Sequence, residues 1–225
     1  YAMEEAGADL IELGIPFSDP TAEGPVIQGA NLRALSGGVT TDKVFDMVEK
    51  IRKNSSIPMV FMTYANVVFS YGIERFCKRA AEVGMDGMIL PDVPFEEKEE
   101  FASVAEKYGL DLISLIAPTS HERISMIAKE AEGFVYCVSS MGVTGQEAQF
   151  HKEVKNYLKS VKEQSKIPVM MGFGIRTAKD VEPMKEYIDG AIVGSHFIRL
   201  LEESNFDLDA VKTYCNTFKK ELNEL

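Results

Sequence analysis

Short, continuous apolar runs alternate along this sequence with longer amphipathic segments. Seven such runs are present, at Asp9–Leu13, Pro58–Thr63, Gly87–Leu90, Asp111–Ile116, Phe134–Val138, Val169–Met171 and Ala191–Val193. Each run is apolar throughout instead of alternating between apolar and polar residues, which is typical of strands buried on both faces. The pattern therefore predicts seven buried parallel strands.

The segments between the runs show helical periodicity. Apolar residues recur at the helical spacing over residues 44–51 and 124–128. Thr119 and Glu122 predict a capping box at the start of the second of these helices. Regular alternation of strands and helices indicates parallel pairing through right-handed crossovers.

This alternation fits two architectures, a closed (β/α)₈ TIM barrel of about 250 residues and a doubly wound open sheet. Tyr1–Gly7 has the pattern of a helix end leading into the first run. The barrel interpretation therefore places the first strand and most of its helix before residue 1. No linker interrupts the pattern, so we predict one barrel domain over residues 1–225. We expect that domain to be incomplete at its N-terminal end. Barrel halves can be related by duplication, but no clear internal repeat is visible.

Composition and charge narrow the class of protein. The 225 residues are 45% hydrophobic and 26% charged, with a net charge of -11, which excludes a disordered chain. An acidic chain without a basic face is unsuited to binding nucleic acid or an anionic membrane. Cys77, Cys137 and Cys215 are odd in number and widely spaced, so no disulfide framework is expected. These features predict a cytoplasmic protein.

The three histidines do not indicate a metal site. His121, His151 and His196 are scattered, and none lies at ligand spacing from a cysteine or an aspartate. His121 and His196 fall near predicted helix starts, where we expect surface positions.

The candidate chemistry lies at the carboxyl ends of the predicted strands, where barrel enzymes place their active sites. Glu12 lies one residue before the end of the first run, and Glu23 follows in the loop after it. A carboxylate on a buried strand is costly unless it has a partner or a function. Two such groups can divide acid and base roles when their environments separate their pKa values. The alternatives are an ion-paired structural Glu12 and a solvated loop charge at Glu23.

Glycines follow the later runs, at Gly142–Gly145, Gly172–Gly174 and Gly194–Ser195. Glycine allows the backbone to approach a ligand closely, and a helix start attracts an anion. Three glycine turns at successive strand ends favour a phosphate site, although each could simply make a tight turn. Tyr64 also follows a strand, where its ring is placed to contact an aromatic substrate.

Taken in order, these motifs resemble the tryptophan synthase alpha chain family. The resemblance rests on Glu12–Pro20, Tyr64–Asn66, Pro91–Pro94, Gly142–Gly145, Gly172–Ile175 and Gly194–Ser195. It implies a (β/α)₈ barrel and a lyase of tryptophan biosynthesis, which cleaves indole-3-glycerol phosphate to indole and glyceraldehyde 3-phosphate. It also implies a partner, the beta chain, in an alpha2-beta2 heterotetramer, with pyridoxal phosphate in the beta chain and no cofactor in this one.

The same resemblance assigns roles to individual residues. The catalytic pair falls on Glu12 and Glu23. The substrate-binding positions fall on Tyr64, Tyr136, Thr144, Gly145, Gly174, Gly194 and Ser195, with Thr144 in a mobile loop. No metal is implied.

The sequence departs from the family pattern at the second carboxylate, which is normally Asp and here is Glu23. The added methylene lengthens its reach, and small displacements matter at such sites. Two alternatives stay open. One is a catalytically weak alpha-like subunit that acts mainly as an allosteric partner of the beta chain. The other is a different phosphosugar barrel enzyme, which would carry a Lys or an Asp at strand ends where this chain has none.

Overall fold

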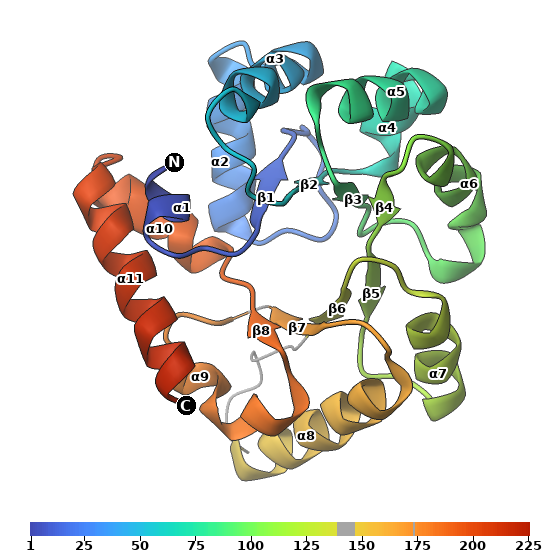
Figure 1. Ribbon diagram of the computed structural model, residues 1–225, viewed down its shortest axis with the longest axis vertical. Coiled ribbons are helices and arrows are strands. Elements are labelled where there is room, and N and C mark those ends of the chain that lie inside the picture. Colours follow the sequence, from blue (N-terminus) through green and yellow to red (C-terminus); the bar gives the residue numbers. More distant parts are fainter. Residues whose placement is uncertain (139–146, 173) are drawn as a thin grey trace. The chain divides into compact units, whose positions relative to one another are not determined.

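The computed structural model describes residues 1–138, 147–172 and 174–225, without the side chains of residues 147–152. The described chain forms two compact units. One contains Tyr1 and residues 3–112, and the other contains Ala2 and residues 113–225. Each unit is built around one four-stranded parallel sheet (Figure 1).

The sheet of the first unit has the strand order β1-β2-β3-β4. Its strands are β1 (Ile11–Gly14), β2 (Met59–Met62), β3 (Gly87–Ile89) and β4 (Asp111–Leu112). Its helices are α2 (Pro25–Ser36), α3 (Thr41–Arg52), α4 (Ala65–Tyr71), α5 (Ile73–Val83) and α6 (Glu99–Lys107), and a short helix α1 (Ala2–Glu5) precedes β1. Glu12 lies opposite Val60 in the register, and Val60 lies opposite Gly87.

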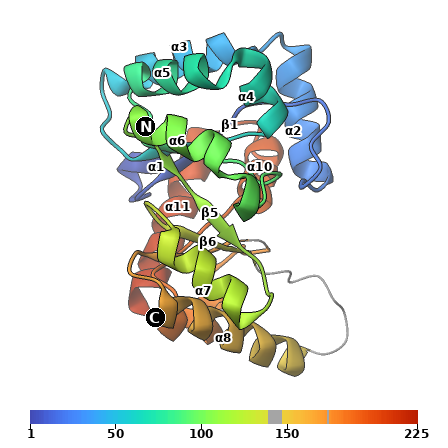
Figure 2. The ribbon, with the colours of Figure 1, turned by 90° about the vertical axis from the view of Figure 1, so that its right-hand side faces the viewer.

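The sheet of the second unit has the order β5-β6-β7-β8. Its strands are β5 (Ser114–Ile116), β6 (Val135–Val138), β7 (Val169–Gly172) and β8 (Gly190–Ala191). Its helices are α7 (His121–Glu130), α8 (Glu147–Gln164), α9 (Ala178–Val181), α10 (Ser195–Glu203) and α11 (Leu208–Glu224), with a 3₁₀ helix over Glu182–Tyr187. α7 and α8 pack side by side (Figure 2).

All seven predicted runs overlap strands, although the last run shares only Ala191 with β8, and every pair of neighbouring strands is parallel. The run Asp111–Ile116 differs from the prediction because it forms two short strands, β4 and β5, in different sheets. The predicted cap of α7 is wrong by one residue. Ser120, not Thr119, is the N-cap, and its hydroxyl accepts a hydrogen bond from the amide of Arg123 at 3.2 Å.

The core of the first unit lies between its helices and one face of its sheet. Phe45 of α3, Phe61 of β2 and Phe76 of α5 are almost fully buried, with ring centroids 5.3 to 5.9 Å apart. Side chains alternate between the faces of a strand. Phe61 points toward the helices, so its neighbour Val60 and the register partner Glu12 lie on the opposite face. The helices thus cover one face of the sheet, and the Glu12 carboxylate lies on the other.

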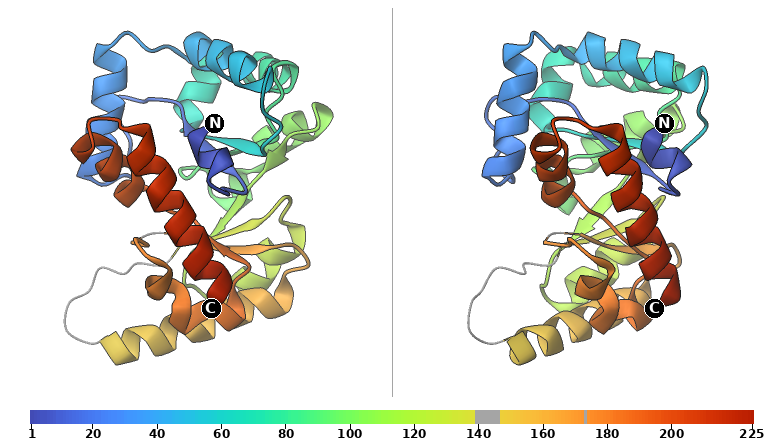
Figure 3. Two further views of the ribbon diagram at one scale, coloured as in Figure 1. Left: turned by 60° about the vertical axis from the view of Figure 1, so that its left-hand side comes forward. Right: turned by 90° about the vertical axis from the view of Figure 1, so that its left-hand side faces the viewer.

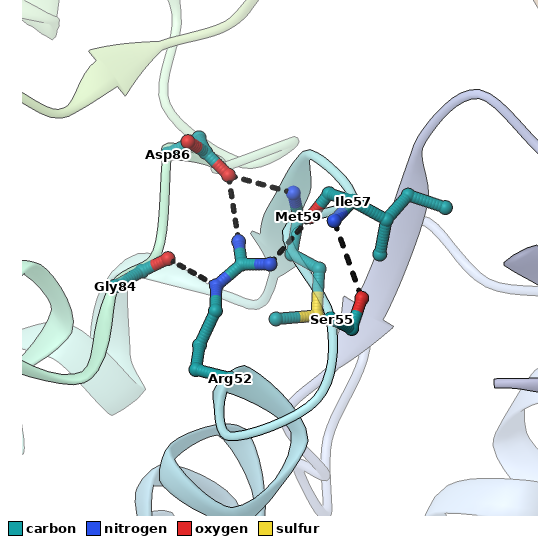
Figure 4. A network of polar contacts seen from close by, with 6 residues as sticks. All are labelled: Arg52, Ser55, Ile57, Met59, Gly84 and Asp86. Atoms are coloured by element: carbon teal, nitrogen blue, oxygen red, sulfur yellow. Dashed lines mark hydrogen bonds and ion pairs between the residues drawn. The ribbon is translucent and has the colours of Figure 1, made fainter.

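A guanidinium holds the amino ends of β2 and β3 to their neighbouring helices (Figure 4). Arg52, at the end of α3, donates to the carbonyls of Gly84 at 2.7 Å and Ile57 at 2.5 Å. It also pairs with the Asp86 carboxylate at 2.9 Å, and that carboxylate accepts from the Met59 amide at 2.8 Å. We call this set of contacts the Arg52 clamp. It satisfies backbone groups at the end of α5 and at the start of β2.

The second unit carries a matching arrangement, the Lys162 clamp. The Lys162 ammonium, near the end of α8, lies 2.5 Å from both carboxylate oxygens of Asp189, and Asp189 accepts from the Val169 amide at 2.7 Å. A serine hydroxyl accepts from an isoleucine amide at 3.2 Å in both units, Ser55 from Ile57 and Ser165 from Ile167.

The two clamps reveal an internal repeat that the sequence pattern alone did not show. A serine, an isoleucine and a proline recur in order, as Ser55-Ser56-Ile57-Pro58 and Ser165-Lys166-Ile167-Pro168. The acidic positions recur as Asp86-Gly87 and Asp189-Gly190. The sequence analysis saw no clear internal repeat, because few positions carry it and the basic one differs, being Arg52 in one unit and Lys162 in the other.

We expect the substitution Arg52→Lys to lower the free energy of unfolding by about 1–2 kcal/mol. An ammonium can pair with Asp86, as Lys162 does with Asp189, but it cannot also supply both backbone carbonyls in fixed directions. Urea unfolding followed by circular dichroism measures the change. The exposed neighbour Lys53→Arg is the control. Equal stability of Arg52→Lys and the control variant would contradict the importance of the clamp.

Candidate active site

Two carboxylates and a tyrosine from β1 and the segments after β1 and β2 form the candidate site of the first unit. Glu12 projects from the face of the sheet opposite the helices, and Glu23 lies in the loop that leads to α2. The Tyr64 hydroxyl, at the end of the segment after β2, forms a hydrogen bond with the Glu23 carboxylate. The structure therefore groups three residues that the sequence analysis selected from two separate segments.

The environment of these carboxylates favours their protonated forms. Burial raises the pKa of Glu12 from its ordinary 4.5 to about 7, and repulsion from the Glu23 charge adds to the shift. Burial also raises the pKa of Glu23, although the hydrogen bond from Tyr64 partly opposes it. Glu23 is thus half-buried and hydrogen-bonded, not a solvated loop charge. Near neutral pH, Glu12 exchanges a proton readily, as a general acid or base must.

Tyr64 is held in place by contacts around its whole side chain. Its hydroxyl accepts a hydrogen bond from the Ala22 amide at 3.2 Å, and its ring lies 5.4 Å from that of Phe17. Burial is the largest cause that raises the pKa of Tyr64, to about 12, so the hydroxyl stays protonated at neutral pH. Tyr64 therefore remains a hydrogen-bond donor for Glu23.

Asp92 belongs to this region, although the sequence analysis gave it no role. It follows β3, and its carboxylate accepts from the Ala65 amide at the start of α4, with distances of 3.0 and 3.2 Å to its two oxygens. A carboxylate at a helix N-terminus is favoured by the helix dipole. The segment Pro91–Pro94 gave no sequence signal for this contact, because its partner lies in another loop.

Tyr136 is the candidate substrate-binding tyrosine of the second unit. It lies in β6 and is buried, and its ring packs directly over Gly172 at the end of β7. A Cβ atom at Gly172 would lie 2.5 Å from Cε1 of Tyr136 and 2.6 Å from its hydroxyl. Only glycine fits beneath this ring, so Gly172 is required by packing.

Two further glycines lie beyond the ends of β7 and β8, which are paired neighbours. Gly174 has a φ of 77°, a conformation that favours glycine. Gly194 is the N-cap of α10 and Ser195 is its first residue, without a side-chain cap. A Cβ at Gly194 would meet no atom of the described residues within 4 Å. The predicted phosphate contacts at Gly174 and Gly194 therefore follow two adjacent strands.

The backbone after Gly174 is fixed by a second carboxylate that the sequence analysis missed. The amides of Arg176 and Thr177 both donate to Asp180, at 2.8 Å each. Thr177 and Asp180 form a capping box at the start of α9. The spacing of Thr177 and Asp180 is a recognisable capping signal in the sequence.

Other sequence predictions have different outcomes. Thr144 and Gly145 lie outside the described residues. His121 is exposed, as expected. The surface prediction for His196 is wrong, because its ring is half-buried against Tyr214, with centroids 5.3 Å apart.

Among the described residues, no three His, Cys, Asp or Glu side chains are grouped to hold a metal ion. No helix in the described ranges is long and apolar enough to cross a membrane.

Parallel strands alternating with helices, acidic groups on and after an early strand and glycine turns after the last strands are the arrangement of a barrel-type enzyme. The family model described as tryptophan synthase alpha chain matches residues 1–224. The tryptophan synthase alpha chain of Lachnospira eligens is 53% identical over 99% of this chain and 86% of that relative. That of Lacticaseibacillus casei is 48% identical over 89% of this chain and 75% of the relative.

Solved structures agree with these sequence relatives. Tryptophan synthase subunit alpha from Legionella pneumophila has a TM-score of 0.89 and 38% identity, covering 100% of this chain and 85% of that one. A chain of the tryptophan synthase complex from Pyrococcus furiosus has a TM-score of 0.84 and 32% identity, covering 100% of this chain and 89% of that one. This chain belongs to the tryptophan synthase alpha chain family. The (β/α)₈ barrel predicted from the sequence is confirmed.

The substitution Glu12→Gln is expected to stabilise the protein at high pH. The folded chain holds the Glu12 proton up to about pH 7, whereas the unfolded chain releases it near pH 4.5, so the wild type loses stability between these values. At roughly 1.4 kcal/mol per pKa unit, the variant gains up to about 3 kcal/mol above pH 7 and almost nothing below pH 4.5.

Urea unfolding at pH 4 and pH 8 measures this gain. The exposed Glu106→Gln is the matched control and should behave as the wild type at both pH values. A Glu12→Gln gain that is the same at both pH values would show that burial of the charge is not its cause.

Proposed function

We propose that this chain cleaves indole-3-glycerol phosphate to indole and glyceraldehyde 3-phosphate, with Glu12 as the acid–base group. This is the alpha reaction of tryptophan synthase, and family membership over nearly the whole chain supports it. The observation that supports the role of Glu12 is its pKa of about 7 on the sheet face opposite the helices. A carboxyl group in that state can both donate and accept a proton near neutral pH.

The reaction is a retro-aldol cleavage. A proton is added to indole C3, the bond from C3 to the glycerol carbon breaks, and the neighbouring hydroxyl loses its proton to become the aldehyde. Protonated Glu12 supplies the first proton, and its carboxylate then accepts the second, so the enzyme returns to its starting state. One residue in the raised-pKa environment suffices for both transfers.

Glu23 is proposed as the electrostatic partner of the indole ring. Positive charge develops on the ring nitrogen when C3 is protonated, and a carboxylate that accepts from the N–H stabilises that charge. The Tyr64 hydroxyl donates to Glu23 and restricts its orientation. This contact supports a catalytic position for Glu23 despite its additional methylene compared with the usual Asp.

The internal repeat supports a phosphate site at Gly174, Gly194 and Ser195. In the first unit, the Asp92 carboxylate binds the Ala65 amide after β2. Counted from the clamp aspartates, the position of Asp92 corresponds to Ser195 in the second unit. Ser195 brings no carboxylate, and a Cβ at the glycine before it, at the start of α10, would meet no described atom within 4 Å. A substrate phosphate would take the place that the internal anion occupies in the first unit.

The remaining substrate contacts are proposed from the family resemblance. Thr144 and Gly145 are assigned to the loop that closes over the substrate. Tyr136 is assigned to the wall of the substrate pocket, and its packing over Gly172 supports a fixed ring position. Phosphate contacts distant from the reacting bond supply binding energy that orients the glycerol chain.

The partner of this chain is the tryptophan synthase beta chain. We propose that the alpha chain needs no cofactor, because an acid–base carboxylate is enough for the cleavage. Pyridoxal phosphate is then confined to the beta chain, which consumes the indole. We place the reaction in the cytoplasm, where the absence of a cysteine framework in the sequence has its simplest explanation.

We expect Glu12→Gln to lower kcat for indole release at least a thousandfold while the affinity for the substrate changes little. The amide keeps the size of the side chain but cannot transfer the proton. Indole release is measured with and without the beta chain, and Glu106→Gln is the control. Activity of Glu12→Gln within a few-fold of wild type would contradict the proposed role, as would a wild-type chain inactive under both conditions.

The pH profile gives a second test of Glu12. If protonated Glu12 starts the reaction, kcat/KM should fall above pH 7, about tenfold per pH unit. The Glu23 charge raises the pKa of Glu12, so Glu23→Gln should move the midpoint of its residual activity to lower pH. A midpoint that stays in place, or moves upward, would contradict the coupling of the two carboxylates.

A further inference from the structure

Tyr214, in the last helix α11, contacts both of the loops proposed to bind the phosphate. α11 runs past α9 and α10 and is drawn in dark red in Figure 3. The sequence analysis gave Tyr214 no role, and neither the acid–base chemistry nor the direct phosphate contacts use it. Its polar and aromatic contacts fall on two different loops of the second unit.

The first contact fixes the loop after β7. The Tyr214 hydroxyl donates to the carbonyl of Arg176 at 2.8 Å. The amides of Arg176 and Thr177 are already bound to Asp180. The backbone at Arg176, two residues after Gly174, is therefore held by two side chains from outside the loop. Asp180 binds its amide and Tyr214 binds its carbonyl. The orientation of the Gly174 peptide depends on that anchorage.

The second contact is with the first turn of α10. The Tyr214 ring lies 5.3 Å from His196 and 6.2 Å from Phe197, measured between centroids, and these residues directly follow Ser195. Phe218, one turn further along α11, packs against Tyr214 at 6.0 Å. One side chain thus contacts the backbone behind Gly174 with its hydroxyl and the residues behind Gly194 and Ser195 with its ring.

We propose that Tyr214 is a positioning residue that sets the spacing between the two glycine turns for the phosphate group. This inference rests on the phosphate site proposed above. Tyr214 itself touches no substrate atom in this scheme. Backbone amides bind a phosphate well only when they are held in place before it arrives, because each small displacement weakens several hydrogen bonds together.

The hydroxyl of Tyr214 remains a donor under all assay conditions. Burial is the main cause that raises its pKa well above the ordinary value, and the neighbouring Cys215 and Asp180 add to the effect. The contact with Arg176 is therefore constant across the neutral pH range, and changes in substrate binding caused by Tyr214→Phe cannot be attributed to titration.

The test compares indole-3-glycerol phosphate with indole-3-glycerol, which lacks the phosphate. Tyr214→Phe keeps the ring and removes one hydrogen bond, so we expect KM for the phosphorylated substrate to rise about three- to tenfold with kcat within twofold. For indole-3-glycerol, kcat/KM should be unchanged. A rise of similar size for both substrates, a loss confined to kcat, or no change at all would overturn the inference.

Two further variants separate this inference from the phosphate site itself. Ser195→Asp gives the second unit the carboxylate that Asp92 provides in the first, and should raise KM for the phosphorylated substrate at least tenfold. If Ser195→Asp has no effect, the phosphate site is wrong. If only Tyr214→Phe has no effect, the site stands and the role of Tyr214 is wrong. Tyr71→Phe, which removes a hydroxyl contact to Asp42 in the first unit, is the matched control.

Discussion

The first backbone amide of a buried parallel strand must find a partner, and in both units an aspartate provides it. Asp86 and Asp189 precede the following strands, and each accepts from the amide that opens the strand before it. A basic side chain from the preceding helix neutralises each carboxylate. The charge is thereby kept at the amino ends of the strands, where it contributes to stability. The carboxyl ends are left to loops that can vary without disturbing the sheet.

Glu12 shows the opposite use of a carboxylate. Asp86 forms an ion pair with Arg52 at 2.9 Å, whereas Glu12 is subject to burial and a like charge, and both favour its protonated form. The same residue class therefore supports the amino ends of the strands in one place and holds an exchangeable proton on the face of the sheet opposite the helices in another. The stability lost when Glu12 ionises is the physical counterpart of its suitability for acid–base work.

Local patterns were sufficient to predict much of this structure. Continuous apolar runs predicted the parallel strands, and the strand-end positions of Glu12, Glu23 and Tyr64 indicated residues that the structure places together. Contacts between distant segments were not predictable. The bond from Tyr214 to Arg176 joins a late helix to an earlier loop, and an amphipathic pattern explains the ring of Tyr214 without its hydroxyl. The repeat escaped detection because the two clamps use Arg52 and Lys162 for one task.

The self-contained Arg52 clamp has a consequence for synthesis of the protein. All its members lie between Arg52 and Asp86, so the necessary atoms have left the ribosome before the second sheet has been translated. Nascent chains emerge from their amino end, and units fold in that order. The first unit can therefore pair its four strands before the second sheet is complete. During translation, the chain can therefore form its first sheet before its second, instead of folding all its strands at once.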